Sequence, residues 1–135
     1  MFKFLRLLGA LTIATSLAAC GSVAAPSNSA AEDFADTLQP GGQMSKNFSV
    51  SKTGEMLVTL QSLNPRPVVG FVTLAVGSPV GTGCAPYGSY YVAQAAVGQQ
   101  YSFPQIVKGS YCLWVADTQG ILPQAATFAV RFTHP

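Results

Sequence analysis

Apolar and polar residues alternate one for one along much of the chain after residue 43, which is the period of a β-strand with one buried face. Phe48 and Val50 lie between polar neighbours, residues 51–54 predict a turn, and the alternation resumes over residues 56–61. This part of the chain therefore predicts a β-hairpin with one apolar face.

Further strands are predicted downstream. Residues 68–76 are almost continuously apolar and rich in branched side chains, which is typical of a central strand covered on both faces. Residues 77–86 are rich in glycine and proline and predict a long connection. Pro104 favours an edge position for a strand at 101–107, because proline cannot donate to a β-ladder. The remaining strands are expected at 87–97, 111–116 and 127–133; in the second of these, Tyr111, Leu113 and Val115 face one way and Cys112 and Trp114 the other.

Seven or eight short strands separated by turns predict an all-β fold, a single antiparallel β-sandwich or jelly-roll-like domain over residues 43–135. Ahead of it, residues 20–42 predict a flexible tether, since their first part is small and polar without periodicity. Within that tether, residues 32–38 predict a helical turn, which Pro40 and the two following glycines end.

The first nineteen residues have the three parts of an export signal. Lys3 and Arg6 supply the positive end, residues 7–17 supply the apolar run, and small residues precede the cleavage point. A helix that crosses a bilayer needs about 20 apolar residues, so this shorter run indicates a removable signal peptide rather than a permanent span.

The end of the signal carries a more specific motif. Leu17, Ala18, Ala19 and Cys20 resemble the lipobox of bacterial lipoproteins. The resemblance implies that Cys20 becomes the first mature residue and carries fatty acyl chains such as palmitate, and two or more chains give stable membrane attachment. Gly21 replaces the aspartate that is associated with inner-membrane retention in enteric bacteria, which favours the outer membrane. The alternatives are an ordinary secretory signal with a chance cysteine and an uncleaved helix.

Charge and cysteine content refine this picture. Without the signal, the chain is formally neutral and has no basic patch, so we expect no nucleic-acid partner. Lipidation of Cys20 leaves Cys84 and Cys112, for which an oxidising compartment favours a disulfide bond over two separate buried thiols. Their 28-residue separation, with a single histidine in the chain, does not match a zinc-ligand spacing, so we expect neither a metal nor a cofactor.

The body of the chain resembles bacterial pre-peptidase C-terminal domains. The resemblance is carried by residues 48–50, the turn at Gly54, the strand at 56–60, residues 109–115 and the closing strand at 128–130. It implies a β-sandwich module that is appended to other proteins for secretion, stability or substrate contact and is not itself a catalyst. Many members of that family have acidic loop residues that are absent here, so the resemblance does not extend to a calcium site.

Catalytic groups are few. His134 is the only imidazole and lies one residue from the carboxyl end, where we expect a frayed chain and a poorly held base. Glu55 and Asp117 flank strands singly, which indicates solubilising charges rather than the carboxylate pair of a glycosidase. We therefore expect no enzyme, with a cleft around Glu55, Asp117 or His134 as the feature that would change this view.

Tyrosines are the best candidates for a binding surface. Tyr87, Tyr90, Tyr91 and Tyr101 could stack on sugars or anchor a protein partner if exposed. Because Tyr90 and Tyr91 point to opposite faces of any strand, cross-strand packing with hydroxyls at the rim is the favoured alternative.

These features predict a non-catalytic envelope lipoprotein, a small β-sandwich interaction or structural module held to the membrane by lipid on Cys20. We expect a monomer whose partner is an envelope protein or a glycan. The alternatives are an inhibitor of a hydrolase such as lysozyme, by analogy of size and location with small lipoprotein inhibitors, and a glycan-binding accessory module.

Overall fold

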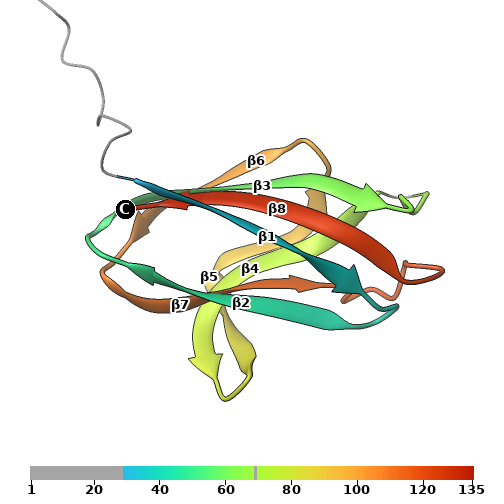
Figure 1. Cartoon of the computed structure of the whole chain (residues 1–135), viewed down its shortest axis with the longest axis horizontal. Coiled ribbons are helices and arrows are strands. Elements are labelled where there is room, and N and C mark those ends of the chain that lie inside the picture. The colour runs from blue at the N-terminus through green and yellow to red at the C-terminus, as the bar shows by residue number, and fades with distance from the viewer. Residues whose placement is uncertain (1–28, 69) are drawn as a thin grey trace, which may run out of the picture.

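The computed structural model describes residues 29–68 and 70–135, which form two facing antiparallel β-sheets (Figure 1). Each sheet has four strands, and no helix in these ranges is long and apolar enough to cross a membrane. The strands are β1 (Ala30–Leu38), β2 (Gln43–Val50), β3 (Gly54–Asn64), β4 (Phe71–Val80), β5 (Gly83–Ala96), β6 (Gln100–Ile106), β7 (Gly109–Ala116) and β8 (Ala126–His134). The prediction of an all-β sandwich of seven or eight strands is therefore confirmed. The export signal and lipobox lie outside the described residues.

The strand order is β1-β8-β3-β6 in the first sheet and β2-β7-β4-β5 in the second. Alternate residues of both sheets point inward and form one apolar core. Its fully buried members include Phe128 and Phe132 from β8, Met56 and Leu60 from β3, and Leu74 and Leu113 from the facing sheet. Burying an apolar side chain of this size stabilises the fold by about 1.5–3 kcal/mol before entropy is counted.

The domain begins earlier than the sequence predicts. Residues 30–38 are not part of a tether and contain no helical turn, because β1 pairs with β8 along its whole length, from Ala30 opposite His134 to Leu38 opposite Ala126. Phe34 and Leu38 are buried four positions apart, a spacing that fits both a helical face and one face of a strand. The pairing partner, which is distant in sequence, decides between the two.

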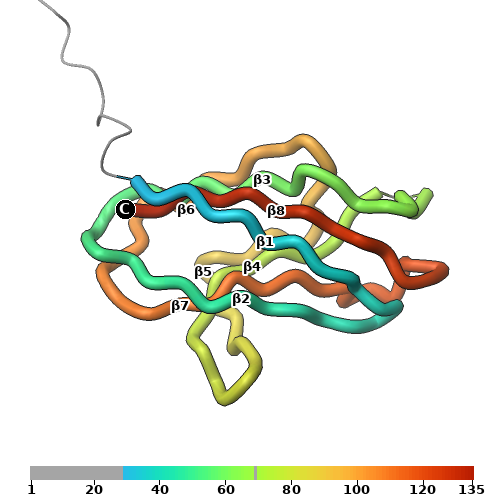
Figure 2. Tube along the Cα trace, viewed as in Figure 1, coloured from blue at the N-terminus to red at the C-terminus, as the bar shows by residue number. Residues whose placement is uncertain are grey.

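The predicted hairpin between residues 47–50 and 56–61 is also wrong. β2 and β3 are both strands, but they belong to different sheets, and the short link between them crosses from one sheet to the other (Figure 2). Both strands turn their apolar residues toward the same core, so alternation alone cannot distinguish a hairpin from a crossing between facing sheets.

Other expectations on strand position are confirmed. β4 is a central strand, and every residue from Phe71 to Gly77 is buried. β6, which contains Pro104, lies at a sheet edge. In β7, Tyr111, Leu113 and Val115 face the core, while Trp114 packs in a separate cluster on the outer side.

Candidate functional site

The connection expected at residues 77–86 is instead a tight β-hairpin. β4 continues to Val80 and β5 begins at Gly83, with Gly81 in the left-handed region at φ 58° to make the turn. The end of this hairpin extends beyond the rest of the β-sandwich (Figure 1). The predicted disulfide between Cys84 and Cys112 is confirmed, with the two Cα atoms 5.8 Å apart, and it fixes the hairpin to β7.

Gly77 allows the two strands of the hairpin to lie unusually close. The register of β4 and β5 shifts between Ala75 and Gly77, and residues 87–90 of β5 have no counterpart there. A Cβ atom added to Gly77 would lie 2.6 Å from the carbonyl carbon of Ala85 and 2.8 Å from the Cα atom of Pro86. The Ala85 carbonyl oxygen lies nearer still, and all three obstacles are backbone atoms, so only glycine fits this position without moving β5.

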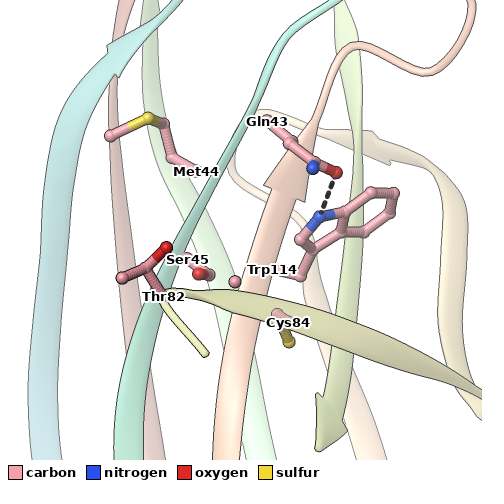
Figure 3. A pocket seen from close by; sticks show the side chains of 7 residues that line it. Gln43, Met44, Ser45, Thr82, Cys84 and Trp114 are labelled. Carbon is pink, nitrogen blue, oxygen red and sulfur yellow. Dashed lines mark hydrogen bonds between the residues drawn. The ribbon is translucent and has the colours of Figure 1, made fainter. Parts of the chain in front are cut away.

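A pocket of about 290 Å³ opens where the hairpin crosses the outer face of the second sheet. Figure 3 shows the segment that carries Thr82 and Cys84 passing across the strands that carry Ser45 and Trp114. We call this site the hairpin pocket, and its lining residues are Gln43, Met44, Ser45, Thr82, Gly83, Cys84 and Trp114.

The polar groups of the hairpin pocket are neutral and in part unpaired. Trp114 Nε1 donates a hydrogen bond of 2.8 Å to Gln43 Oε1, which orients both side chains (Figure 3). The amide nitrogen of Gln43 and the hydroxyls of Ser45 and Thr82 have no partner within residues 29–68 and 70–135. The only cysteine at the pocket is in the disulfide, so the lining carries no ionisable side chain. This arrangement is suited to hydrogen bonding with an uncharged ligand.

The four tyrosines predicted as a binding surface do not form one patch. Tyr90 and Tyr101 are half-buried against the core; the Tyr90 hydroxyl donates to Gln105 O at 2.6 Å, and the Tyr101 hydroxyl accepts from Ala96 N at 2.9 Å. Tyr91 and Tyr87 are 43% and 40% exposed. Packing therefore accounts for two of these side chains and leaves the other two open to solvent.

The two exposed tyrosines also lie against different neighbours. The Tyr91 ring is 6.4 Å from the Trp114 ring, on the outer side of the second sheet and close to the hairpin pocket. The Tyr87 ring packs edge-on against Tyr90 at 6.3 Å and against Tyr111 at 6.4 Å. Tyr91 is thus the member of the predicted set that comes nearest to the pocket residue Trp114.

His134 is not at a frayed end, contrary to expectation. It is 3% exposed, its Nε2 atom lies 2.9 Å from Glu32 Oε1, and its ring packs on Phe48 and Phe132. Burial by itself would raise the pKa of Glu32, but the hydrogen bonds and charges of His134 and Lys46 outweigh it and lower that pKa. The group joins β1 to β8 and β2, and it fixes the N-terminal strand to the rest of the domain.

Asp117 is likewise a structural residue. It is 3% exposed and accepts hydrogen bonds from the backbone N–H groups of Gly41, Ile121 and Leu122 at 2.9, 2.9 and 3.1 Å. Burial by itself would raise the pKa of Asp117, but these donors, together with that of Gly120, outweigh it and hold the pKa below its ordinary value. Asp117 therefore connects the loop after β7 to the turn between β1 and β2.

Glu55 is the third candidate catalytic group. Its Oε1 atom accepts a hydrogen bond of 2.5 Å from Ser102 on the exposed surface of β6. Neither Glu55, Asp117 nor His134 lines the hairpin pocket. Within the described ranges, no three histidine, cysteine or acidic side chains come together in a way that could hold a metal ion. Cys20 lies outside those ranges.

Sequence reasoning missed Gln43, Ser45 and Thr82 as site residues. They come from β2 and from the hairpin turn, which are far apart along the chain and carry no recognisable motif. The one available signal was the pairing of Cys84 with Cys112, which brings the hairpin onto β7. Unless it is known that the chain crosses between the sheets after β2, the pairing of the two cysteines does not indicate that β2 also lies beside the hairpin.

Comparison with known proteins identifies the fold. No protein-family model matches the chain. No curated protein matches it in sequence. A mitogen from Yersinia pseudotuberculosis is similar in structure, with a TM-score of 0.53 and 15% identity over 78% of this chain and 86% of the mitogen. PliG of Aeromonas hydrophila, a periplasmic inhibitor of g-type lysozyme, has a TM-score of 0.50 and 11% identity over 82% of this chain and 90% of the inhibitor. At such identities the likeness shows a shared β-sandwich fold.

Proposed function

We propose that the protein is a non-catalytic envelope lipoprotein, anchored by lipid on Cys20, which binds another component of the envelope through the hairpin pocket. The observation that carries this proposal is the pocket itself, where a disulfide-fixed hairpin places three unpaired polar groups beside a tryptophan. Ligand sites are concave and combine apolar surface with a few convergent polar groups, and this pocket has both.

A binding role is supported by how the candidate catalytic groups are used. His134 is held by Glu32, Asp117 by backbone N–H groups, and Glu55 by Ser102. Each of them contributes to the connections between strands or loops, and none of them lines the pocket. Hydrolysis requires a nucleophile and a base within reach of each other. The lining of the hairpin pocket does not supply such a base.

The chain length between Cys20 and β1 fits an anchor with a short reach. Ala30 is ten positions after Cys20, and an extended chain spans at most about 3.6 Å per residue, so the domain would stay within roughly 36 Å of the lipid. β1 belongs to the first sheet, whereas the hairpin pocket lies on the outer face of the second. The anchored domain can therefore present the pocket on the sheet that does not carry the tether.

Three measurements test this proposal. Intact mass of the protein from membranes should show a chain that begins at Cys20 and carries acyl groups, and Cys20→Ser should release it from the membrane fraction. A photo-crosslinking residue at Thr82 should give an envelope adduct that the same residue at exposed Gln61 on β3 does not give. An unlipidated mature terminus would remove the anchor, and identical crosslinks from both positions would remove the pocket as the binding site.

Inhibition of a hydrolase is the second candidate function, because the fold is shared with a periplasmic inhibitor of g-type lysozyme. The purified protein would then lower the rate of lysozyme on cell-wall substrate. Thr82→Tyr would reduce inhibition if the pocket takes part, and Gln61→Tyr would not. Full lysozyme activity at a large excess of the protein would rule this function out.

A further inference from the structure

We infer that the hairpin pocket binds one residue of a neutral saccharide. This inference rests on the proposed function and names the ligand class for its site. It is carried by the composition of the pocket lining, by its size and by the way the surrounding contacts hold it in place.

The polar groups of the pocket match the hydroxyls of a sugar. The Gln43 amide nitrogen is a donor, while the hydroxyls of Ser45 and Thr82 can each donate or accept. All three have no partner within residues 29–68 and 70–135, so a ligand takes hydrogen bonds from them without breaking protein contacts. Sugar hydroxyls likewise donate and accept, and they can satisfy this mixed set.

The uncharged lining selects against other small ligands. An anion would meet no lysine, arginine or histidine in the pocket lining, and a cation would meet no carboxylate. A wholly apolar ligand would cover the polar groups of Gln43, Ser45 and Thr82 without satisfying them, at a cost of about 1–3 kcal/mol for each. A neutral, hydroxyl-rich ligand avoids both penalties.

Apolar surface is also present where a sugar needs it. Trp114 and Cys84 line the same pocket, and although Trp114 is only 9% exposed, the C–H groups of a pyranose ring can pack on the part of the indole that faces the pocket. The volume of about 290 Å³ is at the lower limit of ordinary ligand sites, so it suits a single ring rather than a long chain. The pocket is open to solvent through the exposed Thr82, which leaves room for the rest of a glycan to continue outside.

The pocket is held in its open form before any ligand arrives. The disulfide fixes the hairpin to β7, and the hydrogen bond from Trp114 fixes the Gln43 side chain. The close approach at Gly77 fixes the path of β5. Such preorganisation lowers the entropy that binding must overcome, which matters most for a small polar ligand with weak individual contacts.

Trp114 provides a direct test because it is the only tryptophan in the chain. The full chain, in micelles of a sugar-free detergent, is titrated with chitotetraose, maltotetraose and cellotetraose, and with sialyllactose as a charged comparator. The indole N–H resonance of Trp114 reports binding, because that N–H bonds to Gln43 at the pocket wall. We expect at least one neutral tetrasaccharide to shift this resonance saturably, with a dissociation constant of roughly 1 mM, and a weaker response to the charged sugar.

Matched variants assign the response to the pocket. Ser45→Tyr should fill the pocket and weaken binding by at least about tenfold, whereas Ser49→Tyr, an exposed position on the same side of β2, should leave it unchanged. Thr82→Ala should weaken binding by about fivefold through loss of one hydroxyl, and Thr53→Ala should not. The absence of any saturable indole shift with all three neutral sugars, or equal binding by Ser45→Tyr and the unmodified protein, would overturn the inference.

The two proposals fail in different ways. If the Thr82 crosslink to an envelope component forms but the sugars cause no shift, the binding role stands and the saccharide assignment is wrong. If the sugars bind but Cys20 carries no lipid, the saccharide site stands and the anchored role is wrong.

Discussion

Replacing Gly77 by alanine tests whether the close approach of β5 to β4 holds the hairpin over the pocket. Carbon atoms in ordinary contact lie about 3.5–4.0 Å apart, so a Cβ at 2.6 and 2.8 Å from backbone carbons must push β5 away by roughly 1 Å. Gly77 does not have a positive φ, so lack of space is the sole obstacle to alanine. Because no side chain can rotate out of the way, we place the cost at about 3 kcal/mol, the upper end for overpacking.

The assay is thermal and urea unfolding, followed by circular dichroism with the disulfide intact. A loss of about 3 kcal/mol lowers the Tm of a domain of this size by about 12 °C. The Trp114 fluorescence should also change in the folded state, since the displaced hairpin lies over the pocket that this residue lines. Gly88→Ala on β5 is the matched control, because nothing lies within 4 Å of its added Cβ, and it should change stability by less than about 1 kcal/mol. Equal stability of Gly77→Ala and Gly88→Ala would refute the reasoning.

Three further predictions concern the groups that hold the domain together. Asp117→Asn should destabilise the fold by about 2 kcal/mol at neutral pH, because one buried N–H loses its acceptor. The folded pKa of Asp117 lies below its ordinary 3.8, so this stabilisation is present above pH 3.8 and is lost as the pH falls through the folded pKa. The free energy of unfolding in urea should therefore change less between pH 7 and pH 3 for the variant than for the unmodified protein. Glu32→Gln should lower the free energy of unfolding by about 1 kcal/mol above pH 4.5, and its effect on the Tm should shrink in acid because the folded pKa of Glu32 is also lowered. A difference in Tm between variant and unmodified protein that is the same at all pH values would contradict the contact with His134. Cys84→Ala combined with Cys112→Ala should lower the unfolding free energy by about 3–4 kcal/mol and speed proteolysis at the hairpin, as should reduction of the unmodified protein; unchanged proteolysis would show that the hairpin stays in place without the bond.

Much of the fold could be predicted because alternation reports burial directly. β8 is predicted nearly to its ends, since each of its buried residues is flanked by a more exposed one. β7 is predicted equally well, although its residues from Tyr111 to Ala116 are buried on both faces of the sheet. The edge position of β6 follows from Pro104, and the disulfide follows from the count of cysteines in a chain that is expected to be exported. These are local or compositional signals, and they survive without knowledge of strand pairing.

The errors arose where the pairing partner is distant. The sequence predicts a tether over residues 20–42 with a helical turn at 32–38, because no period of two is visible there, and only the pairing with β8 makes residues 30–38 a strand. The position of His134 one residue from the carboxyl end predicts a frayed residue, because its partner Glu32 is 102 positions away and leaves no local signal. The link between β2 and β3 has the pattern of a hairpin turn, because the local pattern is the same when the chain crosses between sheets.

The sequence by itself determined that this protein is a β-sandwich, since the period of apolar positions is a property of neighbouring residues. Only the tertiary structure decided where the candidate site lies. The hairpin pocket joins β2, β7 and the β4–β5 turn, which meet because the hairpin folds across the outer face of the second sheet and is bonded there. Such a meeting depends on backbone contacts between segments that are remote in sequence, and no local pattern of residues encodes it.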